Sequence, residues 1–184
     1  MNMRFLFIMD SFETLNLKTE TSLLLMDELL ARGHQVFWLE QGDVYLQHDE
    51  PLGLISEVCA LEPFYKTKAE HLSLNDFDVV LTRLDPPFDQ NYLHLSYVLD
   101  YLDESTLQFN PAKALRNFNE KMLPLRWPEF VPASLVTQNK QRILDFVAEQ
   151  GDVVLKPLDD CSGRGVIKLS SQRRILSQYC RRVC

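Results

Sequence analysis

The sequence predicts a three-layer α/β domain with a parallel sheet, followed by a smaller α+β unit that is incomplete. The order strand, helix, strand within the first 40 residues is the opening of a doubly wound unit. A second pattern, interrupted by several prolines, begins near Pro111. We therefore expect a first domain at residues 1–118, a partial second domain at 119–170 and a basic tail at 171–184.

Short apolar runs predict the strands of the first domain. They lie at residues 4–9, 35–39, 78–82 and 107–109. Between the first two runs, residues 19–32 place Leu23, Met26 and Leu30 on one helical face, and Gly33 is a favourable helix stop.

The middle of the first domain is less regular. Residues 42–75 predict an excursion of short antiparallel strands, separated by HDEPLG. The strand at 78–82 runs into a loop in which Pro86 and Pro87 end regular structure. Residues 90–104 fit the helix that follows.

The second unit is expected to begin with a helix. Pro111 suits the first helical position, and the helix would run to Leu123 with Ala114, Phe118 and Met122 on one apolar arc. Further prolines then stop any long helix.

A second helix of this unit is predicted by its ends. Asn139 would cap it and Gly151 would end it, with Ile143, Phe146 and Val147 facing inward. Strands are expected at residues 135–137, 152–156 and 165–169.

Composition excludes several classes of protein. With 19 basic and 26 acidic residues the net charge is −7, whereas a nucleic-acid-binding domain usually has a basic balance. No apolar run approaches the roughly 20 residues of a membrane span, and the N-terminal segment reaches Asp10 too early for a signal peptide. We expect a cytoplasmic protein with no nucleic-acid or membrane partner.

Cysteines and histidines predict no metal site. The four cysteines form no C-x-x-C pair, and the four histidines have no ligand spacing. Cys180 and Cys184 are better explained by an exposed tail than by a metal site.

The segment LKPLDDCSGRGVIKL, residues 155–169, is the strongest local indication of ligand binding. Lys156 ends a buried strand, and Gly163 and Gly165 flank Arg164 in a turn. Glycines permit a positive φ, so that backbone N–H groups can point at an anion, and a lysine at the strand end can reach phosphate oxygens. A plain β-hairpin with glycines in its turn is the alternative.

Lys121 is a second candidate cation. On the predicted helix it falls beside Ala114 and Phe118, at the margin of the apolar arc. Because lysines are rarely buried unless paired, this position favours a side chain that points into a cleft and binds phosphate. The alternative is a lysine that extends its ammonium to water.

Arg83 follows the strand at 78–82, and the carboxyl ends of parallel strands are where open α/β sheets bind ligands. Its guanidinium could hold a carboxylate through two hydrogen bonds. The alternative is a salt bridge to Asp85 or Asp89. Asp10 has a similar position at the end of the first strand, where it could also cap a loop or helix.

These residues lie in motifs that resemble prokaryotic glutathione synthetase, an ATP-grasp ligase. The resemblance runs from the first strand to about residue 169, and TRLDPPFD, NEK and LKPLD, in this order and spacing, make it specific. Its other marks are FIMDSFETLNLKTETSLLLMDELLARGH, FWLEQGDVYL, LVTQNK and GRGVIKL. It implies a Rossmann-like N-terminal substrate domain followed by ATP-grasp subdomains.

The resemblance also implies a reaction. Glycine and γ-glutamylcysteine are joined with ATP and Mg²⁺ through an acyl phosphate, giving glutathione, ADP and phosphate. Lys121 and Lys156 would contact the ATP phosphates and offset the repulsion between carboxylate and phosphate, and no side chain needs to act as a nucleophile. A loop at 160–165 would close over the nucleotide and exclude water; its ATP-binding residues are Ser162, Gly163, Arg164 and Gly165.

Family members continue well beyond residue 184, in a part that holds the magnesium ligands and much of the adenine pocket. We therefore expect a truncated chain that binds ATP weakly and is inactive alone. The resemblance implies homo-oligomers, although no interface pattern is visible. Two other functions stay open: another ATP-grasp carboxylate–amine ligase, or a non-catalytic fragment that binds a ligand.

Overall fold

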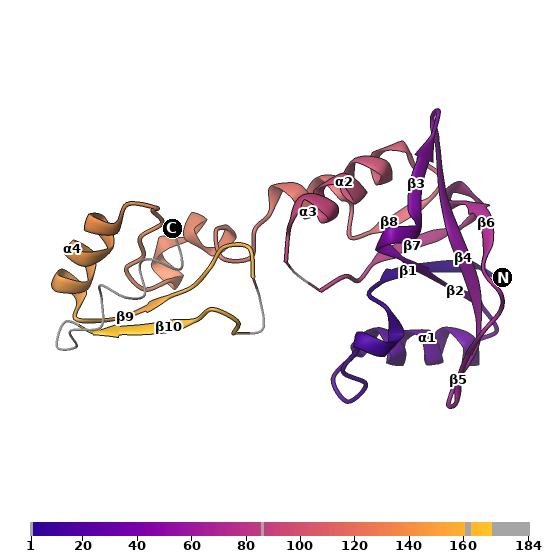
Figure 1. The fold of residues 1–184 in the computed structure, drawn as a ribbon, viewed down its shortest axis with the longest axis horizontal. Coiled ribbons are helices and arrows are strands. Elements are labelled where there is room, and N and C mark those ends of the chain that lie inside the picture. The colour runs from indigo at the N-terminus through magenta and orange to yellow at the C-terminus, as the bar shows by residue number, and fades with distance from the viewer. Residues whose placement is uncertain (1, 86, 161–162, 171–184) are drawn as a thin grey trace. The chain divides into compact units, whose positions relative to one another are not determined.

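The computed structural model describes residues 2–85, 87–160 and 163–170 of the chain. The chain divides into two compact units, Met1–Asn117 and Phe118–Cys184 (Figure 1). The first unit is a mixed α/β layer structure and the second is a small α+β arrangement, in agreement with the predicted fold class.

In the described part of the first unit, eight strands form one mixed sheet. Its main path has the order β3-β4-β2-β1-β7-β8, and β5 and β6 pair with β4. The strands are β1 (Arg4–Met9), β2 (Gln35–Glu40), β3 (Val44–Gln47), β4 (Glu50–Leu61), β5 (Phe64–Lys66), β6 (Glu70–Ser73), β7 (Val79–Thr82) and β8 (Leu107–Phe109).

The helices of the first unit cover both faces of this sheet (Figure 1). They are α1 (Thr21–Ala31), α2 (Gln90–Val98) and α3 (Ala112–Asn117), with short 3₁₀ turns η1 (Phe12–Thr14), η2 (Gln41–Asp43), η3 (Leu74–Asp76) and η4 (Leu99–Tyr101). The helix expected over residues 90–104 therefore ends at Val98 and continues as the single turn η4.

Strand β1 is the centre of the unit. It pairs in parallel with β2 on one side and with β7 on the other. Successive side chains of a strand point to opposite faces. Leu6 and Ile8 accordingly enter the core under α2 and α3, whereas Phe7 and Met9 enter the core under α1 with Met26.

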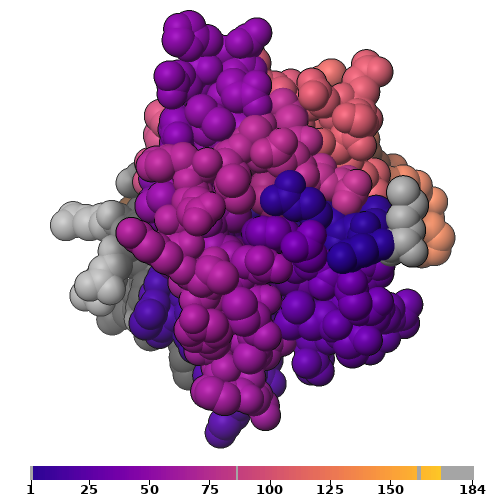
Figure 2. All heavy atoms as spheres, turned by 90° about the vertical axis from the view of Figure 1, so that its right-hand side faces the viewer, coloured from indigo at the N-terminus to yellow at the C-terminus, as the bar shows by residue number. Residues whose placement is uncertain are grey.

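The antiparallel strands β3 to β6 form the expected excursion and dominate the face shown in Figure 2. The predicted interruption at HDEPLG is wrong, because only His48 and Asp49 form the turn and β4 begins at Glu50. His48 has a φ of 60°, which makes this two-residue turn possible.

The second unit contains one helix, α4 (Lys140–Gln150), and one hairpin, β9 (Asp152–Leu155) with β10 (Ile167–Ser170), among its described residues. Asn139 accepts hydrogen bonds from the backbone N–H groups of Gln141 and Arg142, and Gly151 ends the helix with a φ of 82°, as predicted. Two 3₁₀ turns precede it, η5 (Leu123–Arg126) and η6 (Pro128–Phe130).

Two expectations for the second unit are wrong. No strand forms over residues 135–137 in the part of the chain that is described, and Leu135 and Val136 are exposed. The helix expected to reach Leu123 ends at Asn117, so that Phe118 is half exposed instead of lying on an apolar arc.

The packing of α1 generates a stability prediction. Met26 is fully buried under the sheet, so Met26→Ala should lower the free energy of unfolding by about 2–5 kcal/mol through lost burial and a residual cavity. Leu24 lies on the same helix and is 71% exposed, so Leu24→Ala should change it by less than about 0.5 kcal/mol. Urea denaturation of both variants checks this; equal losses would contradict the packing.

Candidate functional site

The sheet of the first unit has a topological switch point. The chain leaves β1 for β2 on one side of it, and it returns to the other side through β7. In open α/β sheets, ligands bind in the crevice at the carboxyl ends of the strands at such a point. Asp10 follows β1 and Arg83 follows β7, so both predicted residues lie at this edge.

Arg83 is held by the start of α1. Its Nε donates to Ser22 Oγ at 3.0 Å, and its Nη2 donates to Thr21 Oγ1 at 2.8 Å. Ser22 is fully buried, and its backbone N–H is bonded to the Glu20 carboxylate that caps the helix. The guanidinium therefore has a fixed orientation, and its Nη1 has no hydrogen-bond partner among residues 2–85, 87–160 and 163–170.

The alternative salt bridge of Arg83 does not form. No ion pair joins it to Asp85 or Asp89 in the described structure. Asp89 instead accepts from the backbone N–H of Tyr92 at 3.0 Å and caps α2. Asp10 accepts from the backbone N–H of Asp85 at 2.9 Å, which ties the loop after β7 to the end of β1.

Tyr92 is a residue of this edge that the sequence did not single out. It lies in the first turn of α2, its ring is 4.9 Å from that of Phe88, and it is half-buried. Burial raises the pKa of its hydroxyl above the ordinary value, and the negative charge of Asp10 raises it further. The phenol therefore stays protonated and can serve as a hydrogen-bond donor.

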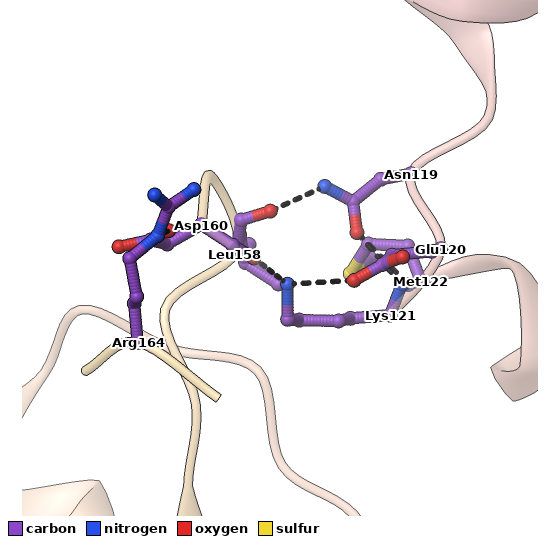
Figure 3. Close-up of polar contacts among 7 residues, drawn as sticks. All are labelled: Asn119, Glu120, Lys121, Met122, Leu158, Asp160 and Arg164. Carbon is purple, nitrogen blue, oxygen red and sulfur yellow. Dashed lines mark hydrogen bonds and ion pairs between the residues drawn. The ribbon is translucent and has the colours of Figure 1, made fainter. Parts of the chain in front are cut away.

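In the second unit, Lys121 lies in a turn and not on a helix. Its ammonium donates to the backbone carbonyl of Asp160 and lies 3.1 Å from Glu120 Oε1 (Figure 3). Its side chain is 18% exposed. The ammonium is therefore neither free in water nor aimed at an empty cleft; it bridges to the loop between β9 and β10.

The loop between β9 and β10 has the geometry of a hairpin connection. Gly163 and Gly165 have φ values of 78° and 66°, in the left-handed region. A Cβ on Gly165 would lie 2.6 Å from Pro157 Cγ, so only glycine allows this close approach. Arg164 Nε donates to Asp160 Oδ1 at 2.7 Å (Figure 3). Ser162 lies outside the described residues.

Lys156 follows β9 and is exposed. Within the described chain it has no hydrogen bond or ion pair, unlike Lys121. It directly precedes Pro157–Asp160, the segment whose last carbonyl receives the Lys121 ammonium. The structure thus brings Lys121 to the loop that begins at Lys156.

Other features add no site to these. A hollow of about 340 Å³ in the first unit is lined by residues of η2, β3 and α2, among them Gln41 and His94, and it contains no predicted site residue. No group of three or more histidine, cysteine, aspartate or glutamate side chains that could hold a metal ion occurs in the described residues. None of the described helices has the length and apolarity that a bilayer span requires.

Two family models match the chain in tandem. The N-terminal domain of prokaryotic glutathione synthetase matches residues 3–116, and the ATP-grasp domain of prokaryotic glutathione synthetase matches residues 120–183. The second match reaches into the basic segment 171–184. The interval between the two matches coincides with the division of the chain into two units.

Curated relatives agree with these matches. The glutathione synthetase of Nitrosomonas europaea is 33% identical over 177 residues, which cover 92% of this chain and 55% of the relative. That of Vibrio cholerae is 33% identical over 167 residues, which cover 88% and 52%. The chain thus spans about half the length of the curated relatives it matches.

Solved structures share the fold. The ATP-grasp ligase PsnB, in complex with a minimal precursor, Mg and ADP, has a TM-score of 0.51 at 20% identity, over 96% of this chain and 61% of PsnB. The D-alanine–D-alanine ligase of Helicobacter pylori has a TM-score of 0.50 at 13% identity, over 100% of this chain and 60% of that enzyme. At these identities the likeness concerns the fold alone.

The surroundings of Tyr92 generate a prediction for the sheet edge. Asp10→Asn keeps an acceptor for the Asp85 N–H but removes the charge, so the pKa of Tyr92 should fall while staying above its ordinary value, because burial is the larger cause. An NMR titration of ring-labelled tyrosine, assigned with Tyr92→Phe, measures this. Asp27→Asn, exposed on α1, is the control; an unchanged or raised pKa in Asp10→Asn would contradict the proximity.

Proposed function

Because the chain belongs to the prokaryotic glutathione synthetase family, we propose that the protein takes part in the ATP-dependent ligation of γ-glutamylcysteine and glycine. The products are glutathione, ADP and phosphate. The observation that carries this proposal is the tandem match of a substrate domain and an ATP-grasp domain along one chain. We place the reaction in the cytoplasm and expect a homo-oligomer.

The residues of the second unit fit a nucleotide phosphate. Lys156 offers an ammonium without a polar partner among the described residues, and the Lys121 ammonium is bound to a carbonyl that a phosphate oxygen could replace. Gly163 and Gly165 hold the backbone in the left-handed region, where successive N–H groups can face an anion. We assign ATP binding to these four residues and to Ser162 and Arg164.

The charges of these residues suit the first chemical step. Attack of the γ-glutamylcysteine carboxylate on the γ-phosphorus of ATP brings two anions together, and the two ammonium groups lower that repulsion. The acyl phosphate that forms reacts with water, so a loop closed over it protects it until the glycine amine attacks. Mg²⁺ supplies charge neutralisation on phosphate oxygens when bound; we assign it no ligand among the described residues.

Arg83 fits a substrate carboxylate. Ser22 and Thr21 accept from Nε and from one N–H of Nη2, so Nη1 and the second N–H of Nη2 remain for an anion at the carboxyl edge of the sheet. Two parallel N–H donors match the two oxygens of a carboxylate. We propose that it binds a carboxylate of γ-glutamylcysteine.

A second candidate function is ligation of a different acid and amine by the same chemistry. The fold is shared with PsnB and with D-alanine–D-alanine ligase, which shows that this architecture occurs in ligases of different names. The phosphate-binding residues would act in the same way, and only the role of Arg83 would change.

A hybrid protein tests the proposed function. Residues 1–169 of this chain are followed by the remaining C-terminal part of the Nitrosomonas europaea enzyme, and glutathione formation is followed by mass spectrometry. We expect ATP-dependent glutathione synthesis, with Lys121→Ala and Lys156→Ala lowering kcat/KM for ATP by roughly 10²-fold, as for other positioned charge donors. Lys113→Ala, exposed on α3, should stay within about twofold.

A folded hybrid that hydrolyses ATP or joins other substrates without making glutathione would favour the second candidate function. A folded hybrid that binds ATP with neither lysine affecting it would remove both lysines from the mechanism.

Arg83 is tested in the same hybrid. Arg83→Gln should raise KM for γ-glutamylcysteine by roughly 10- to 100-fold, the loss expected for a charged hydrogen bond, and leave KM for ATP nearly unchanged. Arg32→Gln removes an exposed cation that directly follows α1 and pairs with Glu28, and it should alter neither constant. Equal changes in both KM values for Arg83→Gln would indicate a structural role.

A further inference from the structure

The position of Lys121 is set by a side chain and not by a helix. Helix α3 ends at Asn117, and the Asn119 Oδ1 then accepts the backbone N–H of Lys121 at 2.9 Å and that of Met122 at 3.3 Å (Figure 3). An asparagine that takes up the N–H groups two and three residues ahead closes a local turn. The backbone of Lys121 is therefore fixed by Asn119.

The other end of the same amide reaches the loop between β9 and β10. Asn119 Nδ2 donates to the carbonyl of Leu158 at 2.7 Å, across 39 positions of sequence (Figure 3). The Lys121 ammonium makes a second tie, to the Asp160 carbonyl two residues further on. One neutral amide and one ammonium thus join the turn at 119–122 to the segment 158–160.

These two ties respond differently to a phosphate group. A phosphate oxygen adds the attraction of opposite charges to its hydrogen bond with an ammonium, which a neutral carbonyl does not, so a bound phosphate competes for Lys121 against the Asp160 carbonyl. The amide of Asn119 carries no charge and gives a phosphate no comparable advantage. When the Lys121 ammonium binds phosphate instead of the Asp160 carbonyl, the hydrogen bond from Asn119 to Leu158 keeps residues 119–122 beside the loop.

We propose that Asn119 is a positioning residue for nucleotide binding, which holds the Lys121 turn and the segment 158–160 together while phosphate occupies the ammonium. It acts through Lys121 and touches no substrate itself. This inference rests on the proposed function, because it requires that Lys121 binds the ATP phosphates.

Two uncharged substitutions in the 184-residue chain separate the two contacts of Asn119, the one with the backbone of Lys121 and Met122 and the one with Leu158. Asn119→Ser keeps a short side-chain acceptor for the N–H groups of Lys121 and Met122 but cannot reach Leu158. Asn119→Ala removes both contacts. Asn139→Ala is the matched control, because Asn139 caps α4 in the same way without touching Lys121 or its loop.

Amide hydrogen exchange reports on the turn. We expect exchange at Lys121 to be roughly fivefold faster in Asn119→Ala and close to wild type in Asn119→Ser, because its backbone N–H is bonded to the Asn119 side chain. The N–H of Met122 also donates to the backbone carbonyl of Asn119 at 3.1 Å, a bond that every variant keeps, so its exchange should change less. Unchanged exchange in Asn119→Ala would overturn the assignment of the turn to Asn119.

Affinity for ATP with Mg²⁺, measured by NMR titration in the millimolar range, reports on the tie to the loop. Both Asn119 variants should weaken binding by roughly fivefold, and Asn139→Ala should not. On a Lys121→Ala background, Asn119→Ser should have no further effect, because the two residues act as one unit. Equal weakening with and without Lys121 would show a merely structural role and overturn the inference.

The outcome also separates this inference from the proposed function. If Lys121→Ala leaves ATP affinity unchanged, the assignment of phosphate binding to Lys121 fails, and the inference fails with it. If Lys121→Ala weakens ATP binding and Asn119→Ser does not, the inference alone fails.

Discussion

The contact between the Lys121 ammonium and the Asp160 carbonyl is the interaction on which the proposed phosphate site of the second unit depends. A largely covered ammonium must have acceptors, and the turn at 119–122 supplies only Glu120. The loop between β9 and β10 supplies the other. This requirement brings a residue that follows α3 to a loop some 40 positions later, and it places a positive charge beside the loop to which we assign ATP binding.

In the first unit, hydroxyl groups orient the cation of Arg83. Without partners, an arginine at the carboxyl end of β7 would be mobile or would form a salt bridge with a nearby acid. Asp89 instead caps α2, and Asp10 accepts from the backbone of the loop after β7. Thr21 and Ser22 therefore receive the guanidinium, and neither neutralises it. Both units thus present oriented cations, one directed by hydroxyls and the other by a carbonyl, which suits the anionic substrates that we propose.

Periodicity predicts the parts of this structure that are determined by burial. The runs at β1, β2 and β7 are mostly apolar because these strands are covered on both faces. The inward faces of α1 and α4 are also visible in the sequence, as are the glycine that follows α1 and the asparagine cap of α4. The end of α3 could not be found this way, because an apolar arc continues through Phe118 and Met122 while the side chain of Asn119 competes for the backbone. An asparagine at position 119 with a proline at 124 is a sequence signal that α3 ends early. The contacts of Arg83 with two hydroxyl groups and the proximity of Asp10 to Tyr92 arise from tertiary structure, so no local sequence pattern predicts them.

The loop between β9 and β10 shows why a bulky Arg164 is compatible with a glycine-dependent turn. Gly165 is required by space, because its backbone lies against Pro157, whereas Gly163 meets nothing within 4 Å and is required only by its φ. Arg164 lies between the two glycines; its side chain is 52% exposed, and its Nε donates to the Asp160 carboxylate. The backbone path is therefore set by the two glycines and the proline, and the arginine adds an ion pair outside that path. Since Asp160 also carries the carbonyl that receives Lys121, the side chain and the main chain of one residue connect both cations to the same segment.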